Sequence, residues 1–305
     1  MLPCLVARPH LFSVLYEFHP ISEFFSRILI ACPIDSIRIA LNRIIMFLST
    51  SYHGETVKEN HQNHSEGNFG DDQFVFPEDP KQYFLNLLFP SLFNDFDNNS
   101  YEDYFWTLAS LIKLVFESNA SSNTVNLKDL YITVIRMIKE RPIYEDRVSE
   151  TPDRALAGFM HLAQSLLEIE PALKSIFTDS RPEIQTLLEK NGLVGFKLIE
   201  ELHNYLFYIP SDDTHSIQSS LSLPKCKKKL TRKKTFALLV TLCSECDENF
   251  FTLLPLLARN HSQLYSNDLS GGLQANYLNV DTRNFTGFVG LKNLGCTCYI
   301  NSLLQ

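Results

Sequence analysis

The sequence has little of the residues that mark extended or repetitive chains. Its 305 residues include only 11 glycines and 14 prolines, against 23 phenylalanines and 12 tyrosines. This composition excludes collagen-like and linker-dominated proteins, because both classes depend on glycine and proline. A hydrophobic content of 45% can instead supply the core of one large domain or two ordinary ones.

Long apolar runs and regularly spaced cysteines are also missing. The longest apolar stretch near the start, Ile28 to Ile34, is far shorter than the roughly 20 residues of a membrane-spanning helix. Pro9, His10 and Glu17 interrupt the apolar residues that a signal peptide would need. Seven cysteines without regular spacing are typical of reduced thiols in the cytosol. We therefore expect a cytoplasmic protein with no membrane partner.

Positive charge is scarce outside one segment. The chain carries 27 basic and 35 acidic residues, a formal net charge of -8, so nucleic-acid binding is not expected. Seven of the bases fall within residues 225–234, KCKKKLTRKK. Such a run can bind an importin, an acidic partner or RNA, but it is more often a solvated helix start. Nuclear entry is therefore left open beside the cytoplasm.

Apolar residues recur at helical spacing over most of the chain, and no segment alternates with period two. The pattern predicts helices over residues 36–48, 83–93, 101–117, 127–141, 152–169, 183–190, 193–208 and 231–246. Thr151 and Pro152 have the residue types of an N-cap and a first-turn proline, and Gly192 follows a predicted helix end near Asn191.

Short polar joints between helices suit antiparallel helix pairs. We expect an all-α fold, either an armadillo/HEAT-like helical solenoid or an irregular helical bundle. The expected organisation is a helical segment at 1–48, a flexible polar loop at 49–73, an armadillo-like helical region at 74–264 and a linker at 265–286. A Ser- and Asp-rich joint at 211–224 divides the helical region.

Two weak metal-like patterns do not predict a metal site. Cys243 and Cys246 form a CxxC, but zinc needs about four ligands and the nearest other thiol is Cys226. We expect both sulfurs to pack on one helix face, as free cysteines commonly do. His61 and His64 lie in the polar loop, where solvated histidines are the simpler interpretation. No metal or cofactor is expected.

The last residues, GLKNLGCTCYINSLLQ, can be interpreted chemically. Gly290 and Gly295 bracket a loop, and a helix is predicted to start near Cys298. A thiol at a helix entrance is favoured in its thiolate form by the macrodipole and by unpaired amides. The amide of Asn293 could help to stabilise the oxyanion of an acyl-transfer intermediate. The alternative is that Cys298 is a buried structural thiol.

This segment resembles the cysteine box of the ubiquitin-specific proteases, G-L-x-N-x-G-x-T-C-Y-x-N-S-x-x-Q. All fixed positions match, namely Gly290, Leu291, Asn293, Gly295, Thr297, Cys298, Tyr299, Asn301, Ser302 and Gln305. The resemblance implies that Cys298 is the nucleophile and Asn293 the oxyanion-hole residue. Residues 226–264 are also similar, less specifically, to the helical segment before the catalytic domain in giant fat-facets-type members.

The resemblance implies a deubiquitinase that hydrolyses ubiquitin conjugates at the C-terminal glycine of ubiquitin. Residues 287–305 would then be the start of its catalytic domain, with the first helix of a papain-like cysteine-protease fold. Ubiquitin and ubiquitinated proteins would be its partners. All nine histidines precede Cys298, whereas the family's general base follows the cysteine box, so we expect these 305 residues to be inactive alone. The alternative is a non-catalytic interaction or scaffold protein of the ubiquitin pathway, with protein partners on its helical surface.

Overall fold

The computed structural model describes residues 21–51, 79–97, 100–118, 125–145, 151–207 and 224–270. Within these ranges the chain forms ten α-helices and two short 3₁₀ helices, and no strand. The expected all-α class is therefore confirmed for the part of the chain that the structure describes. In chain order the elements are α3 (Ile21–Ala31), α4 (Asp35–Ser51), α5 (Pro80–Leu88), η2 (Phe89–Phe93), α6 (Asp103–Glu117), α7 (Leu127–Glu140), α8 (Arg154–Ile169), η3 (Pro171–Ser175), α9 (Pro182–Lys190), α10 (Leu198–Leu206), α11 (Lys229–Cys243) and α12 (Asp247–Ser270).

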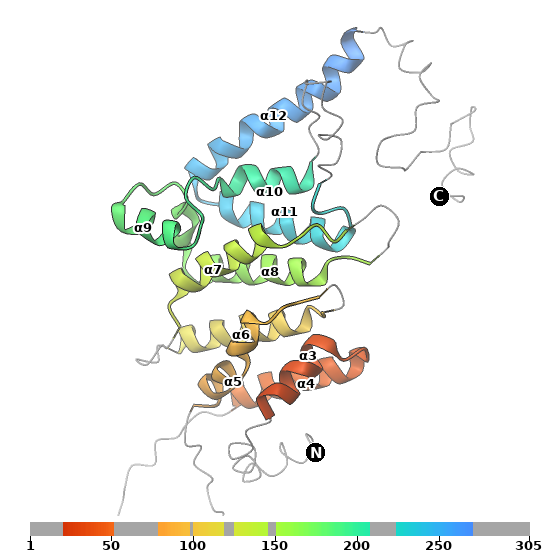
Figure 1. Cartoon of the computed structure of the whole chain (residues 1–305), viewed down its shortest axis with the longest axis vertical. Helices are drawn as coiled ribbons and strands as arrows, with labels where there is room; N and C mark the ends of the chain where they lie inside the picture. The colour runs from red at the N-terminus through yellow and green to blue at the C-terminus, as the bar shows by residue number, and fades with distance from the viewer. Residues whose placement is uncertain are drawn as a thin grey trace, which may run out of the picture.

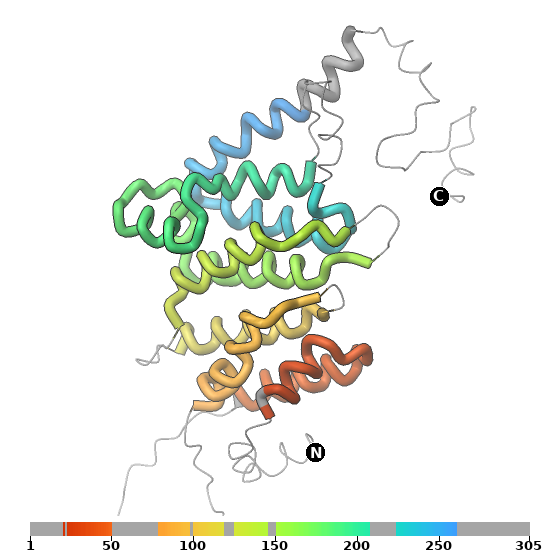
Figure 2. Tube along the Cα trace, in the orientation of Figure 1, coloured from red at the N-terminus to blue at the C-terminus, as the bar shows by residue number. Residues whose placement is uncertain are grey.

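The helices are stacked along the long axis of the molecule (Figure 1). Helices α3, α4 and α5 lie at one end, and α12 lies at the other. Helix α8 is central, because it packs against α6, α7 and α11. The tube trace shows α6, the α7/α8 pair and the α10/α11 pair following one another between the two ends (Figure 2). Each helix thus buries its apolar stripe against its neighbours in the stack.

Aromatic side chains fill the contact between α6 and α8. Phe105 and Phe159 meet edge to face with ring centroids 5.0 Å apart, and Phe96 lies 5.0 Å from Phe105. Gly158 faces this cluster, since a Cβ atom there would lie 2.1 Å from Cδ2 of Phe105. Only a residue without a side chain lets the two helices approach this closely.

The predicted helices 36–48, 101–117 and 127–141 agree with α4, α6 and α7 to within about three residues. The prediction for 83–93 was wrong in part, because α5 ends at Leu88 and a 3₁₀ helix carries the chain to Phe93. Pro90 lies in the first turn of that 3₁₀ helix, where its missing N–H cannot continue the α-helical pattern.

Three other helix ends differ from the predictions. Helix α8 begins at Arg154, and its N-cap is Asp153 rather than Thr151, with the Asp153 carboxylate accepting the N–H of Leu156 at 3.0 Å. Helix α10 begins at Leu198 rather than Leu193, because the intervening turn contains Gly195 at a φ of 66°. Helix α11 ends at Cys243 and a separate helix, α12, follows.

Candidate functional site

The two predicted catalytic residues, Cys298 and Asn293, lie outside the described residues, as does the rest of the cysteine box. His61 and His64 also lie outside them. Among the residues that the structure does describe, no three His, Cys, Asp or Glu side chains gather as metal ligands would. None of the described helices is long and apolar enough to cross a membrane.

The CxxC cysteines are not packed on one helix face, contrary to the prediction. Cys243 is the last residue of α11, and Cys246 is the residue before α12. Both side chains are half-buried free thiols. The helix stops between them because Glu245 adopts a φ of 56°, in the left-handed region. The two thiols therefore flank a turn at the joint between two helices.

The basic run at 225–234 is anchored to the helical body, so it is not simply a solvated helix start. Lys225 is buried, and its ammonium donates to the carbonyl of Ile138 at 2.6 Å. Burial lowers the pKa of Lys225 to about 8. Arg232 donates to the carbonyl of Leu206 at 2.7 Å. Lys229 and Lys233 are the exposed bases of the run.

A buried carboxylate, Glu145, holds the start of this run in place. The carboxylate accepts the backbone N–H groups of Lys227 and Lys228, at 2.5 and 2.8 Å, and the hydroxyl of Thr231 at 2.9 Å. Lys228 is the N-cap of α11 and makes no side-chain cap of its own. Glu145 therefore supplies the negative charge that a helix N-terminus favours, although the helix begins with a basic residue.

A buried ion pair adjoins Glu145. The carboxylate of Asp153 pairs with Nε of Arg141 at 2.7 Å, and the side chains are 6% and 1% exposed for Arg141 and Asp153. The backbone N–H of Asp153 donates to Glu145 at 3.0 Å. Arg141 also donates to the carbonyl of Phe96 at 2.9 Å. We call Arg141, Glu145 and Asp153 the Glu145 cluster; it links the end of α7, the start of α8 and the start of α11.

The buried thiol of Cys226 lies beyond this cluster. Its Sγ accepts the hydroxyl of Thr235 at 3.2 Å, and burial raises the pKa of Cys226 to about 12. A thiol of this kind stays protonated at neutral pH and cannot act as a nucleophile. Cys226 is therefore a structural residue.

The single tryptophan marks a surface shared by α6, α8 and α11. Trp106 is 45% exposed, and its ring stacks on His161 with centroids 4.3 Å apart. The ammonium of Lys234 lies 4.4 Å from the centroid of the Trp106 ring, within cation–π range. Burial, assisted by the charge of Lys234, lowers the pKa of His161 to about 4. His161 is therefore neutral at pH 7 and does not supply a titrating base there.

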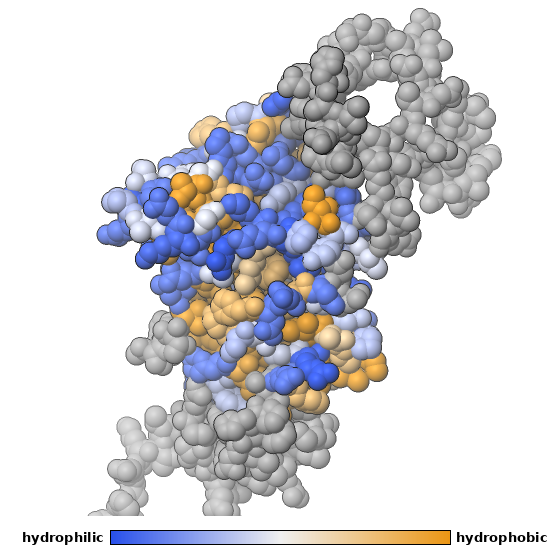
Figure 3. Space-filling model, in the orientation of Figure 1, coloured by the Kyte–Doolittle hydropathy of each residue, from blue (hydrophilic) through white to orange (hydrophobic). Residues whose placement is uncertain are grey.

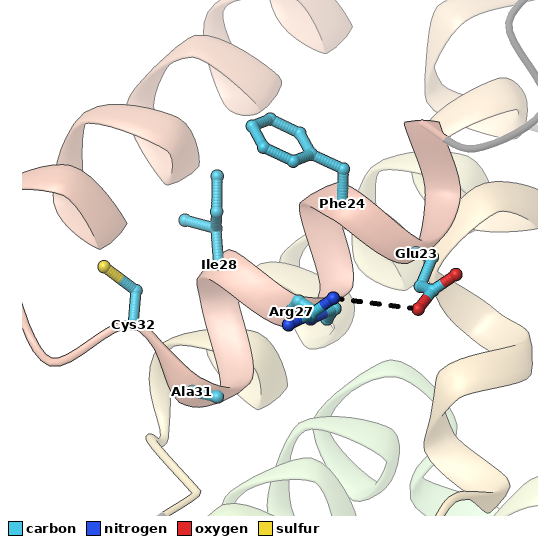
Figure 4. Close-up of a pocket in the computed structure, with 6 residues that line it drawn as sticks. All are labelled: Glu23, Phe24, Arg27, Ile28, Ala31 and Cys32. Atoms are coloured by element: carbon cyan, nitrogen blue, oxygen red, sulfur yellow. Dashed lines mark ion pairs between the residues drawn. The ribbon is translucent and has the colours of Figure 1, made fainter.

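Two of the grooves on the described surface are large enough to be considered as sites. One, of about 560 Å³, follows α3 and contains Cys32 and the Glu23–Arg27 ion pair (Figure 4). Phe24 and Ile28 point to the same side of α3 as Cys32. The other, of about 420 Å³, lies between the end of α6 and the starts of α7 and α9. Neither groove is lined by both a cysteine and a histidine, so neither has the parts of a thiol-protease site.

Helix α12 leaves an apolar face uncovered at the end of the stack. Its inner side is anchored by Asn249, whose amide donates to the carbonyls of Leu242 and Lys174, at 3.0 and 2.9 Å. On its outer side four large apolar side chains are 41–65% exposed, namely Phe250, Phe251, Leu254 and Leu257. Apolar atoms are visible along α12 at the top of the space-filling view (Figure 3). We call these four residues the α12 face.

The Glu145 cluster could not have been found from the sequence. Glu145 sits in an ordinary polar stretch, YEDRVSETPD, and its partners before and at the start of α11 are more than 80 residues away. The clustering of bases was visible, but nothing local indicated which bases would be buried.

Comparison with known proteins gives matches over most of the chain. Ubiquitin carboxyl-terminal hydrolase puf of Drosophila melanogaster is 29% identical over 207 residues, 67% of this chain and 4% of that protein. Human ubiquitin carboxyl-terminal hydrolase 34 is 27% identical over 206 residues, 67% of this chain and 5% of that protein. Human ubiquitin carboxyl-terminal hydrolase 9Y is 27% identical over 235 residues, 74% of this chain and 9% of that protein.

The chain thus spans less than a tenth of the length of each of these relatives. No protein-family model matches it, and no solved structure matches it. Several long relatives nevertheless align with two thirds or more of its residues at similar identity. The chain is therefore a distant homologue of these ubiquitin carboxyl-terminal hydrolases.

Proposed function

We propose that the chain is part of a deubiquitinase that hydrolyses ubiquitin conjugates at the C-terminal glycine of ubiquitin. The observation that carries the proposal is the cysteine box, in which every fixed position is matched by Gly290 to Gln305. The homology to ubiquitin carboxyl-terminal hydrolases supports it, since that similarity extends over far more of the chain than the box.

In this proposal the Cys298 thiolate attacks the carbonyl carbon of the ubiquitin C-terminal glycine. The Asn293 amide donates to the oxyanion that forms, and loss of the substrate amine leaves a thioester on Cys298. Water then hydrolyses the thioester and releases ubiquitin. The reaction needs no cofactor. No histidine follows Cys298 within the 305 residues, so we propose that this polypeptide alone does not turn over substrate.

The helical region would serve as the support that precedes the catalytic domain, which begins at residue 287. We interpret it as an armadillo/HEAT-like solenoid, because successive helices pack on their neighbours along one axis. A cytoplasmic location is part of the proposal. The anchoring of Lys225 and Arg232 leaves fewer free bases in the 225–234 run for a nuclear import receptor.

The test uses the protein produced from its complete reading frame and a ubiquitin probe with a C-terminal electrophile. We expect the probe to form a covalent adduct on Cys298, and Cys298→Ala to abolish the adduct. Cys296→Ala is the matched control, because it removes the neighbouring thiol and should leave labelling intact. An adduct that persists in Cys298→Ala, or none in the unaltered protein, would overturn the proposal.

A second candidate is a non-catalytic interaction or scaffold protein of the ubiquitin pathway. The α12 face favours it, because contiguous exposed apolar side chains are typical of protein interaction sites. Glu245, Asp247 and Glu248 lie at the start of α12, so the face suits a partner whose apolar patch has a basic border.

Ubiquitin is the probe for this second candidate. If the scaffold proposal is correct, titrating isotope-labelled ubiquitin with the 305-residue chain should shift NMR resonances of ubiquitin. A double variant that carries both Phe251→Asp and Leu254→Asp should cause no such shifts. Val194→Asp is a matched control, because Val194 is also exposed but belongs to the turn between α9 and α10 and not to α12. Non-covalent binding of this kind without labelling of Cys298 would favour the scaffold, and the reverse result would favour the enzyme.

A further inference from the structure

The CxxC pair has the backbone geometry of a turn that a disulfide can close. The N–H of Cys246 donates to the carbonyl of Cys243 at 3.4 Å. A four-residue turn of this kind keeps its first and last Cα atoms within about 7 Å of each other. Cα atoms joined by a disulfide lie about 4.4–6.8 Å apart. The two cysteines are therefore held near disulfide distance by the main chain.

Other elements fix this turn in place. The ammonium of Lys174, in η3, donates to the carbonyl of Ser244 at 2.7 Å. The amide of Asn249 donates to the carbonyl of Leu242 at 3.0 Å, on the other side of the turn. Hydrogen bonds from Lys174 in η3 and from Asn249 in α12 thus hold the turn in place. A fixed turn raises the effective concentration of one thiol at the other, because little chain entropy is left to lose on closure.

The two thiols differ from Cys226 in exposure and from Cys32 in having a second cysteine close by. Cys243 and Cys246 are half-buried, so a small oxidant can reach them, whereas Cys226 is fully buried. Burial raises the pKa of Cys243, and the neighbouring Cys246 raises it further. The second effect reflects two ionisable sulfurs that lie close together. Cys32 lies 211 positions before Cys243 in the sequence, between α3 and α4, and these two helices lie at the opposite end of the stack from α12 (Figure 1).

We propose that Cys243 and Cys246 form a reversible disulfide and make the α11–α12 joint a redox-sensitive site. The oxidant is a low-molecular-weight disulfide such as oxidised glutathione. The Cys246 thiolate attacks one glutathione sulfur, which breaks the glutathione S–S bond and releases one glutathione thiol. Cys243 then attacks the Cys246 sulfur of the mixed disulfide and releases the second. Two protein thiols are oxidised, one glutathione disulfide is reduced, and both protons end on the glutathione thiols.

Closure would restrain the turn that sets the start of α12 against the end of α11. The backbone already holds the turn, so we expect oxidation to slow local opening rather than to move the helices. The α12 face lies on this helix. The redox state of Cys243 and Cys246 would therefore change how rigidly the α12 face is held. The inference is independent of the proposed function, because it needs neither ubiquitin nor Cys298.

The test uses the 305-residue chain, equilibrated in glutathione buffers of increasing oxidised fraction, alkylated and mapped by mass spectrometry. We expect the peptide with both cysteines to lose two hydrogens and resist alkylation, under conditions in which Cys32 and Cys226 are still alkylated after unfolding. Cys243→Ser should convert the product to a glutathione adduct on Cys246. A variant with Cys4, Cys296 and Cys298 changed to serine should keep the Cys243–Cys246 disulfide.

Hydrogen exchange supplies a second measurement. Oxidation should slow exchange of the amides at residues 244–250 in the unaltered chain and leave it unchanged in Cys243→Ser. Pairing of either cysteine with a different thiol, or only separate glutathione adducts on both in the unaltered chain, would overturn the proposal. A circular dichroism spectrum shows whether each variant has kept its helical fold.

Discussion

The carboxylate of Glu145 accepts the backbone N–H of Lys227 at 2.5 Å, across 82 residues of chain. It accepts the N–H of Lys228 and the hydroxyl of Thr231 as well, at the start of α11. The buried Glu145 carboxylate thus caps α11. Without it, the N-terminus of this helix would have only the basic run beside it and no negative partner. The body of the protein thus supplies one opposing charge at the start of the run, and backbone carbonyls accept from the buried Lys225 and from Arg232.

Replacing Glu145 by glutamine tests this role. The amide would place an NH₂ group among backbone donors and lose the charge, so at least one buried donor would be left unpaired. We expect the free energy of unfolding in urea to fall by about 2–3 kcal/mol. Glu189→Gln, on the exposed side of α9, is the control and should change it by less than about 0.5 kcal/mol. Equal stability of the Glu145 variant and the unaltered chain would contradict the capping role.

The Arg141–Asp153 pair gives a second prediction. Arg141→Met leaves the Asp153 carboxylate, 1% exposed, without its cation, and should lower the free energy of unfolding by about 3–5 kcal/mol. The chain contains a matched control, the pair Arg181–Asp179, in which the Arg181 side chain is 72% exposed. Arg181→Met should lower the free energy of unfolding far less, because solvent screens an exposed pair. Similar losses of unfolding free energy in the two variants would show that burial does not determine how much these ion pairs contribute to stability.

The helical body was predictable because its period is local, while the helix ends depend on distant contacts. The apolar stripe of α6 could be recognised from Tyr104, Leu108 and Leu111 alone. The start of α8 could not, since Thr151 and Asp153 are both good N-cap residues and Arg141 fixes the one that is used. The position of the 225–234 run against the helical body depends in the same way on a contact that is distant in the sequence, the one with Glu145.

The catalytic assignment rests on the sequence alone. Cys298 and Asn293 lie outside the described residues, so their roles stay predictions. The CxxC was interpreted from its spacing as two sulfurs on one helix. The break at Glu245, a residue with no strong preference for a positive φ, carries no sequence signal and changes that interpretation.

Gly158→Ala should destabilise the protein, although alanine favours helix formation. The added methyl group would lie 2.1 Å from the Phe105 ring, well inside van der Waals contact. The gain of about 1 kcal/mol in helix propensity is smaller than the cost of forcing α6 and α8 apart. We expect a net loss of about 1–3 kcal/mol in the free energy of unfolding. Phe105→Leu in the same chain should relieve part of that cost, and a lack of such coupling would contradict the close approach.

The Trp106–His161 stack predicts how stability depends on pH. In the folded protein the pKa of His161 is lowered to about 4 by burial and by Lys234, whereas in the unfolded chain it is near 6.5. The unfolded state therefore binds a proton that the folded state does not, between pH 6.5 and pH 4. Stability contributed by the neutral imidazole is complete above pH 6.5 and is lost as the pH falls through this window.

His161→Phe keeps an aromatic ring over Trp106 and removes the titrating group. We expect the free energy of unfolding of this variant to fall less between pH 7 and pH 5 than that of the unaltered chain, as measured by urea unfolding at both values. His203 also has a lowered pKa because of burial, and it is present in both proteins, so the difference between them isolates His161. The same pH dependence in the two proteins would mean that His161 is not kept neutral by the α6–α8–α11 surface.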